Sequence, residues 1–294
     1  MTVQGLTLKT KAAPHAAQTE EETMTFGTIL KSARGAVAAL GLAALAATGL
    51  SHGASAQSID DILSKKKLTV GMLVDVAPFG LLDTQGKPEG YDADVARLMG
   101  KYLGVEVELV PVTGPNRIPY LLTNKVDVLI AVFGITPERA KQVMFSIPYS
   151  TIEIQLIGPK KTEIKSLDQT VGKKIAVARA STQDTALTAA VPKGTTIMRF
   201  DDDATAVQAF LSGQVDLLGA NNLIGANIAQ ANPDMGIEKK ITLRSQYNGI
   251  TVRRGSTDFL QWINTFLYFV KNNGELDAIN QKWFKTPLPN MPTF

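Results

Sequence analysis

The chain has 294 residues, 30 of them Lys or Arg and 27 Asp or Glu, and its formal net charge is +3 at pH 7. The basic residues are scattered, which gives nucleic acid no basic patch to bind. The chain has no cysteine, and its two histidines, His15 and His52, lie in the first 56 residues. The remainder therefore lacks disulfides, Ser-His-Asp and Cys-His nucleophile systems and the usual zinc sites. Catalysis by paired carboxylates or by lysine stays open, and we expect neither a cofactor nor a metal ion.

Residues 1–56 are predicted to be a leader that ends in a secretory signal peptide. Basic residues precede the apolar stretch Gly35 to Leu50, and Ala54-Ser55-Ala56 offers small residues at the cleavage positions. A transmembrane anchor is the alternative, but about sixteen residues are short for a bilayer. The polar start of the chain makes Met24 an alternative initiation site. We expect a periplasmic mature protein that begins at or near Gln57.

From Leu68 onward, short apolar runs alternate with longer amphipathic ones, a pattern typical of βαβ units around a parallel sheet. This predicts an α/β fold. The expected strands lie at 68–74, 105–112, 126–132, 151–158, 174–178, 195–200, 215–218 and 241–252, and the expected helices at 92–103, 116–125, 181–190, 203–214, 258–271 and 275–284.

One short pattern occurs twice. Leu121 to Leu129 and Phe210 to Leu218 each read as a helix end, a polar turn, a Val-Asp pair and a strand, 89 residues apart. The order of the flanking elements matches as well. The repeat predicts two similar lobes.

The run from Val126 to Tyr149 predicts an anion-binding site. An apolar strand ends near Val132, and Thr136 and Pro137 have the pattern of a helix N-cap and first turn. Arg139 then lies at the carboxyl edge of the sheet, where α/β sheets bind ligands. Backbone N–H groups and the guanidinium can converge there on one carboxylate. Taken alone, Arg139 is also compatible with a solvated helix face.

Together with Gly90 to Ala96, this run resembles the paired signatures of the extracellular solute-binding proteins of polar amino-acid ABC importers. The similarity extends from about Leu68 to Phe284. It implies two lobes, each a mostly parallel sheet flanked by helices, joined by a two-strand hinge that closes on a ligand. Residues 57–152 and 249–294 would form lobe 1, and 153–248 lobe 2. It also implies a monomer that meets an inner-membrane ABC permease.

The resemblance assigns the ligand's α-carboxylate to Arg139, and places Ser181 and Thr182 opposite it at the start of the first helix of lobe 2. Thr182 would contribute its backbone N–H and hydroxyl, although Ser and Thr are also common helix caps without any ligand. Phe133 would supply an apolar wall in place of an aromatic lid, because Val76 stands where many relatives have an aromatic residue.

Other positions bear on ligand charge. Relatives often have a carboxylate and a hydroxyl where this chain has Asn221 and Gly134. We therefore expect the cleft to prefer anionic ligands. Asp75 follows the first strand near the cleft. Arg117 and Arg179 are further candidates, although either alone is more typical of a surface. We interpret two more acids, Asp92 and Asp94, as helix-capping groups and not as a catalytic pair.

The sequence therefore predicts a periplasmic substrate-binding protein that captures a polar amino acid, acidic or neutral, for an ABC importer. One alternative is a binding protein for a small carboxylate without an α-ammonium. Another is a dehydratase-like enzyme on the same fold, but Asn221 stands where a cleft carboxylate would serve catalysis best. A ligand-sensing module would need a signalling segment, which the mature chain lacks.

Overall fold

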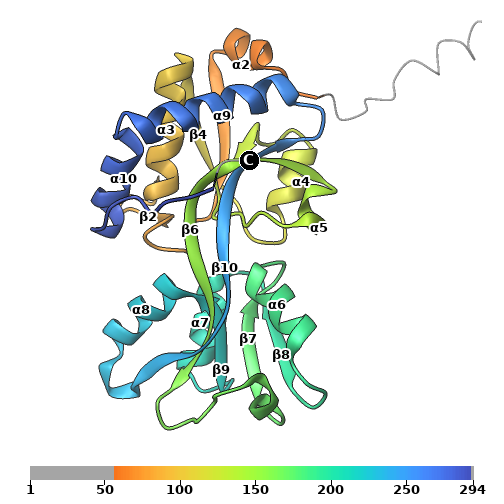
Figure 1. Cartoon of the computed structure of the whole chain (residues 1–294), viewed down its shortest axis with the longest axis vertical. Coiled ribbons are helices and arrows are strands. Elements are labelled where there is room, and N and C mark those ends of the chain that lie inside the picture. Colours follow the sequence, from red (N-terminus) through yellow and green to blue (C-terminus); the bar gives the residue numbers. More distant parts are fainter. Residues whose placement is uncertain (1–55, 293–294) are drawn as a thin grey trace, which may run out of the picture. The chain divides into compact units, whose positions relative to one another are not determined.

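The computed structural model describes residues 56–292, and the predicted signal peptide lies outside this range. The described part of the chain forms two α/β lobes (Figure 1). No helix within it is long and apolar enough to cross a membrane.

Lobe 1 is built on three parallel strands in the order β4–β1–β5. Its strands are β1 (Lys67–Met72), β4 (Glu106–Pro111) and β5 (Val128–Leu129), with a small hairpin of β2 (Leu81–Leu82) and β3 (Pro88–Glu89). Strand β4 lies at the sheet edge, as its alternating pattern predicted. The lobe's helices are α2 (Ile59–Lys65), α3 (Tyr91–Leu103), α4 (Arg117–Leu122) and α5 (Pro137–Ala140), followed much later in the chain by α9 (Thr257–Asn272) and α10 (Glu275–Phe284).

Lobe 2 repeats this arrangement, with the parallel order β9–β7–β8. Its strands are β7 (Lys174–Ala178), β8 (Thr196–Phe200) and β9 (Leu217–Asn221), and its helices are α6 (Thr182–Ala190), α7 (Asp203–Leu211) and α8 (Asn222–Ala231). Two 3-10 helices, η1 (Leu167–Thr170) and η2 (Pro233–Met235), complete it.

The repeated Val-Asp pair has the same role in both lobes. Asp127 accepts from the main-chain N–H of Thr69 on β1 at 2.9 Å and donates its own N–H to the Thr69 carbonyl at 2.8 Å. Asp216 makes the same two bonds with Lys174 on β7, at 2.8 and 2.9 Å. Each aspartate thus ties the strand that follows it to the central strand of its lobe.

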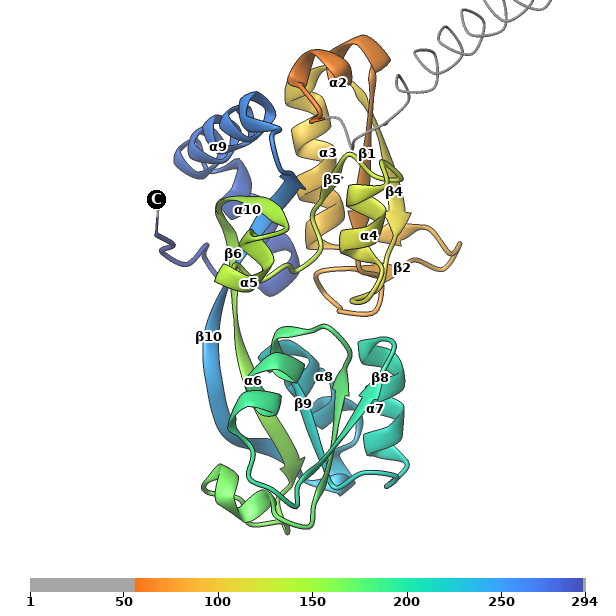
Figure 2. The ribbon, with the colours of Figure 1, turned by 90° about the vertical axis from the view of Figure 1, so that its right-hand side faces the viewer.

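Two long antiparallel strands connect the lobes, β6 (Val143–Pro159) and β10 (Ile237–Arg253) (Figures 1 and 2). In lobe 1, β10 pairs with β5 through Thr251. In lobe 2, β6 pairs with β9 from Ile154 to Ile157. Between these points the two strands pair mainly with each other, for example Thr151 with Tyr247, and β10 also forms a bridge from Asn248 to Gly134. These are the two crossovers that the sequence predicted near 149–154 and 247–251.

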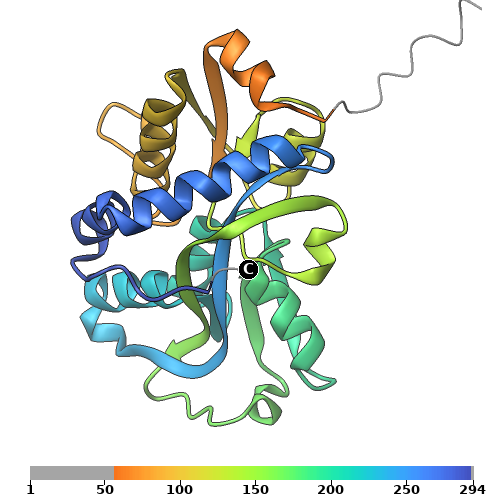
Figure 3. The same ribbon diagram turned by 45° about the horizontal axis from the view of Figure 1, so that its top comes forward.

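The C-terminal helices α9 and α10, drawn in blue, lie against lobe 1 (Figure 3). Helix α9 packs on β6, and α10 packs on α3 and α9. The Phe284 ring of α10 packs at a tilt against the rings of Phe79 and Tyr91, with centroid distances of 4.9 and 5.0 Å. Both ends of the described chain therefore belong to lobe 1.

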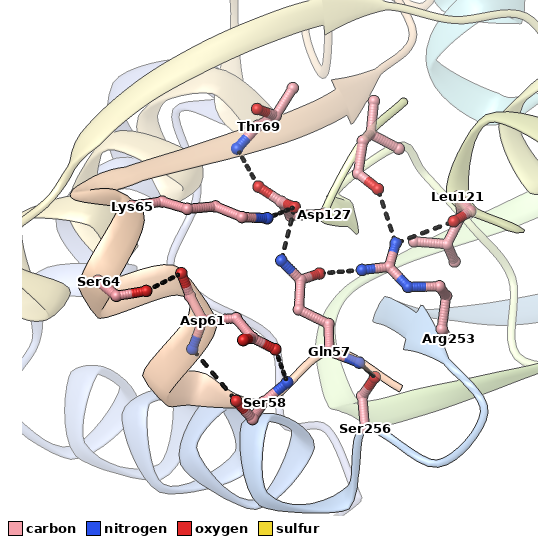
Figure 4. Close-up of polar contacts among 11 residues, drawn as sticks. Gln57, Ser58, Asp61, Ser64, Lys65, Thr69, Leu121, Asp127, Arg253 and Ser256 are labelled. Atoms are coloured by element: carbon pink, nitrogen blue, oxygen red, sulfur yellow. Dashed lines mark hydrogen bonds and ion pairs between the residues drawn. The ribbon is translucent and has the colours of Figure 1, made fainter. Parts of the chain in front are cut away.

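The first residues of the described chain are anchored in lobe 1 (Figure 4). The main-chain N–H of Gln57 donates to Ser256 Oγ at 3.0 Å, and its Nε2 donates to Asp127 Oδ1 at 2.6 Å. Arg253 Nη2 donates to Gln57 Oε1. Gln57 is therefore buried and links Asp127 to Arg253, two buried charged residues of lobe 1.

Residues with positive φ cut two of the predicted elements short. The predicted strand 126–132 is regular only as β5, because Val132 adopts φ +47° and turns the chain out of the sheet. The predicted helix 116–125 ends at Leu122, and Asn124 then adopts φ +59°.

Candidate functional site

Arg139 is presented by a very short helix. In α5, Thr136 is the N-cap and its Oγ1 accepts from the main-chain N–H of Arg139 at 3.3 Å, with Pro137 at the first helical position. The guanidinium folds back toward the preceding turn, where Nη1 donates to the Gly134 carbonyl at 2.9 Å. The predicted helix start is confirmed, and it directs Arg139 toward lobe 2.

Across the cleft, Arg139 meets the start of α6. Its Nη1 donates to Thr182 Oγ1 at 3.1 Å, and its Nη2 donates to the Ala180 carbonyl at 3.0 Å. Ser181 is the N-cap of α6, with Oγ accepting from the Asp184 N–H at 3.1 Å. The structure therefore brings Arg139, Ser181 and Thr182 together, and these contacts join the two lobes.

Phe133 forms a wall beneath two guanidinium groups. It is 1% exposed, and the Cζ atoms of Arg117 and Arg139 lie 4.1 and 4.5 Å from its ring centroid. Guanidinium groups are attracted to aromatic faces at such distances. The aromatic ring thus fixes the position of both cations.

Arg117, a candidate site residue of a type more often found on the surface, is buried here, with 4% of the residue exposed. Its Nη1 donates to the Ala131 carbonyl at 3.1 Å, and its Nη2 donates to the lobe-2 carbonyl of Ala180 at 3.4 Å. Burial lowers the pKa of Arg117, and the negative charges of Asp203 and Asp75 oppose that shift. Arg117 therefore contributes a buried positive charge to the cleft.

Burial also lowers the pKa of Arg139, and repulsion by Arg117 and Arg244 lowers it further. Because a guanidinium stays protonated in proteins, this direction means that the positive charge is poorly compensated by the surrounding groups. An anion beside Arg139 would offset that cost. Arg179, in contrast, lies on the rim, with its side chain 54% exposed and 3.7 Å from Asp201.

A cavity of about 40 Å³ lies between the lobes. Of the predicted site residues, Asp75, Arg117, Ser181, Thr182 and Asn221 line it. Sequence reasoning missed several others. They include the polar residues Asp202, Asp203 and Gln246 and the apolar residues Leu73, Ile152 and Ile154.

Asp203 gave no distinct signal in the sequence because an acid in the first turn of a helix is common. In the structure it faces Asp75 across the cleft, and its main-chain N–H donates to Asp75 Oδ2 at 2.7 Å. Burial raises the pKa of Asp203 to about 7, and the charge of Asp75 raises it further. The pKa of Asp75 is also raised, chiefly by burial.

Asn221 and Gly134 both have structural roles. Asn221 is the N-cap of α8, and its Oδ1 accepts from the N–H groups of Leu223 and Ile224, each at 2.9 Å. A Cβ at Gly134 would lie 2.5 Å from Cδ of the buried Gln246 side chain. A larger residue at position 134 therefore requires Gln246 to move.

Asp92 and Asp94 do not cap α3, so that interpretation was wrong. The N-cap is Gly90, and no side chain caps the helix. Asp94 binds Lys282 and Trp283 of α10, at 2.6 and 2.8 Å.

The fully buried Asp92 instead holds the turn that carries Phe133. Its Oδ2 accepts from the Val132 N–H at 3.1 Å, and its Oδ1 accepts from Tyr149 Oη at 2.8 Å. Val132 has φ +47°, which is strained for a β-branched residue. Ala180, at φ +59°, faces the same cleft from lobe 2. Strained residues of this kind cluster at ligand sites.

No group of three or more His, Asp or Glu in residues 56–292 is arranged to hold a metal ion. Two lobes joined by two long strands, with the Arg117 guanidinium and the N-termini of α6 and α7 at the cavity between them, define a protein that binds a small solute. The chain belongs to the bacterial extracellular solute-binding proteins, family 3, whose sequence model matches residues 68–286.

The chain is 30% identical over 246 residues to the L-cystine-binding protein TcyJ of Escherichia coli (strain K12), covering 81% of this chain and 92% of that protein. It is 32% identical over 253 residues to the glutamine-binding protein GlnH of Bacillus subtilis (strain 168), with 83% and 92% covered. The crystal structure of a mutant of ArgBP from T. maritima has a TM-score of 0.72 and 33% identity, covering 78% of this chain and 99% of that one. These relatives are binding proteins and not enzymes.

Proposed function

We propose that this protein is the substrate-binding component of an ABC importer, and that it captures a polar amino acid and delivers it to a membrane permease. In this proposal Arg139 and the Thr182 hydroxyl hold the ligand's α-carboxylate. The observation that supports it best is the poorly compensated guanidinium of Arg139, which faces the N-terminus of α6 and is supported by Phe133. The relatives named above support the amino-acid class.

The remaining site residues have secondary roles in the proposal. Arg117 and Asp75 contact the side-chain end of the ligand, and Asn221 and Gly134 shape the wall of the cavity. Arg179 lies at the cleft rim. Arg117 and Arg139 favour an acidic or neutral side chain on this amino acid, and Asp75 and Asp203 add negative charge to the same cleft. We also propose that residues 57–152 and 249–294 form lobe 1 and residues 153–248 form lobe 2. The protein is a monomer in this proposal.

Ligand binding tests the proposal. A thermal-shift screen of amino acids and small organic acids should give stabilisation by at least one amino acid, since a ligand at a hundred times its Kd contributes about 2.7 kcal/mol. Arg139→Ala should then weaken that ligand at least tenfold by calorimetry, because truncating one partner of a buried charge pair costs about 2–5 kcal/mol. The matched control is Arg97→Ala, an exposed arginine on α3 outside the cavity, which should bind normally. Stabilisation only by carboxylates without an α-ammonium would contradict the amino-acid assignment.

We also propose that the protein is exported and that residues 1–56 are removed. The signal-peptide pattern supports this, as does Gln57, whose main chain and side chain are both anchored in lobe 1. The intact mass of the secreted protein should correspond to a chain beginning at or near Gln57. A mass that includes the apolar stretch 35–50 would contradict it.

A further inference from the structure

Closure of the cleft brings acids from the two lobes together. Asp75 follows β1 in lobe 1, and Asp203 is the first residue of α7 in lobe 2. The 2.7 Å bond from the Asp203 N–H to Asp75 Oδ2 fixes this approach, and both residues line the cavity. Asp202, which also lines the cavity, is the N-cap of α7 and accepts from the Thr205 N–H at 2.7 Å. Asp202 is therefore already partnered, whereas Asp203 has one side-chain partner, because its Oδ1 accepts from Gln183 Nε2 at 3.0 Å.

The charges around this acid pair are not balanced. Arg117 is the cation that acts on Asp203, while Asp75 and Asp202 both repel it. Arg139 does not line this cavity but a neighbouring pocket, which it shares with Thr182 and Arg244. Two carboxylates facing one guanidinium leave one negative charge in excess. Like charges brought together out of water are costly unless a positive group joins them.

A second observation, independent of the acids, also calls for a ligand. In the described part of the chain, the buried side-chain atoms without a hydrogen-bond partner are Arg117 Nε, Gln246 Oε1, Arg253 Nε and Lys271 Nζ. The first two belong to residues that line this cavity and are 4% and 3% exposed. Gln246 uses its Nε2 to donate to Asn248 Oδ1 at 2.5 Å, which leaves its oxygen as a buried acceptor. Such an acceptor is satisfied by a ligand N–H.

We propose that Asp75 and Asp203 form an acid clamp, one residue from each lobe, that closes on a positively charged nitrogen of the ligand. The inference rests on the proposed function, in which Arg139 takes the carboxylate. An ammonium or guanidinium supplies several N–H donors and the missing positive charge. The clamp then selects amino acids over carboxylates that lack a cationic nitrogen, and makes that nitrogen a condition for full closure.

The test compares Asp75→Asn, Asp203→Asn and the control Asp201→Asn. Asp201 is the neighbouring acid, 83% exposed at its side chain and outside the cavity. Calorimetry would use three probes: glutamine, lysine and glutarate, the last of which has no nitrogen. Both clamp variants should lose at least about tenfold in affinity for the amino acid that the wild type binds, and the control should lose less than about threefold. Equal losses for glutamine and lysine identify the α-ammonium as the clamped group, whereas a loss confined to lysine identifies the side chain.

A second readout separates a clamp from a structural role. A cation placed beside Asp203 lowers its pKa, so binding near pH 7 should release protons. Titrations in two buffers of different ionisation enthalpy should detect this release in the wild type and a smaller release in Asp203→Asn. Unchanged amino-acid affinity in both clamp variants would overturn the inference, as would tight wild-type binding of glutarate that neither variant improves. If no amino acid binds the wild type at all, the proposed function itself fails.

Discussion

Val132 shows how a single residue prepares the site. A valine at φ +47° is strained, and the surrounding structure must hold it there. Its N–H donates to Asp92 Oδ2 and to Tyr149 Oη, at 3.1 and 3.2 Å. Tyr91 in turn donates to the Tyr149 carbonyl at 2.8 Å. This buried network fixes the residue that precedes Phe133, so it positions the wall on which both arginines stack.

The network should make stability depend on pH. Burial raises the pKa of Asp92 to about 7, above its ordinary value of 3.8. Between these two values the folded state binds a proton that the unfolded state has released, so the free energy of unfolding should fall as pH rises. Each such group contributes at most about 1.4 kcal/mol per pH unit. The raised pKa of Asp203 acts in the same direction.

Urea unfolding of the ligand-free protein between pH 5 and pH 7 measures this slope. Carboxyl groups whose pKa is lowered, such as Asp94, are ionised in both states across this window and add no slope. Asp92→Asn should flatten the dependence relative to the wild type. An identical slope in wild type and variant would show that Asp92 is ionised in the folded protein at pH 5.

The N-cap residue Thr136 determines where the short helix α5 begins and how it is oriented. With four residues it is too short to be stable alone, so its geometry depends on the Thr136 cap and on packing against β6. Local signals predicted this helix start, and they also predicted Ser181 as a cap and Gly104 as the end of α3. Such signals involve residues within four positions of one another, which makes them readable in the sequence.

Thr136→Ala should therefore reduce both stability and ligand affinity. Loss of an N-cap costs about 1 kcal/mol, and here the same bond orients Arg139. Ser58→Ala is the matched control, because Ser58 caps α2 with a similar bond far from the cavity, accepting from the Asp61 N–H at 3.1 Å. Chemical denaturation should show similar losses for both variants, while calorimetry should show weaker binding for Thr136→Ala alone. Equal affinities would mean that packing alone orients Arg139.

The features that the sequence did not reveal depend on contacts between distant elements. The burial of Arg117 depends partly on the carbonyl of Ala180, 63 positions away. The approach of Asp203 to Asp75 spans 128 positions. The sequence suggested that Asp92 caps a helix, because it lies at a helix start. Its hydrogen-bond partners instead lie on β6 and in the turn after β5. The α/β class and the position of Arg139 followed from periodicity and motif, which are local properties, and the two-strand hinge followed from the family resemblance.

At the scale of the whole described chain, few direct contacts hold the cleft closed. Arg139 reaches Thr182 and Ala180, Arg117 also reaches Ala180, Asp203 reaches Asp75, and Asn227 Nδ2 donates to the Ala77 carbonyl at 3.2 Å. The lobes are otherwise joined by β6 and β10, which pair mainly with each other. This arrangement permits hinge closure with each lobe moving as a body.

We expect ligand to shift the protein toward this closed arrangement. Small-angle scattering should show a smaller radius of gyration at saturating ligand, while far-ultraviolet circular dichroism stays unchanged because no element is made or lost. Asp201→Asn should behave as the wild type. A radius of gyration that does not respond to a ligand bound in the calorimeter would mean that closure precedes binding.

The two long strands also determine how the protein could have been assembled from parts. The chain leaves lobe 1 along β6 and returns along β10, so that Ile152 pairs with Gln246 and Glu153 with Ser245. Residues paired in antiparallel strands are only about 5 Å apart. Lobe 2 is thus a continuous segment inserted into the chain of lobe 1, and the two ends of this segment lie next to each other. Recombination at that junction could exchange the half of the cleft that carries Thr182 and Asp203 while leaving Arg139 and its supports intact.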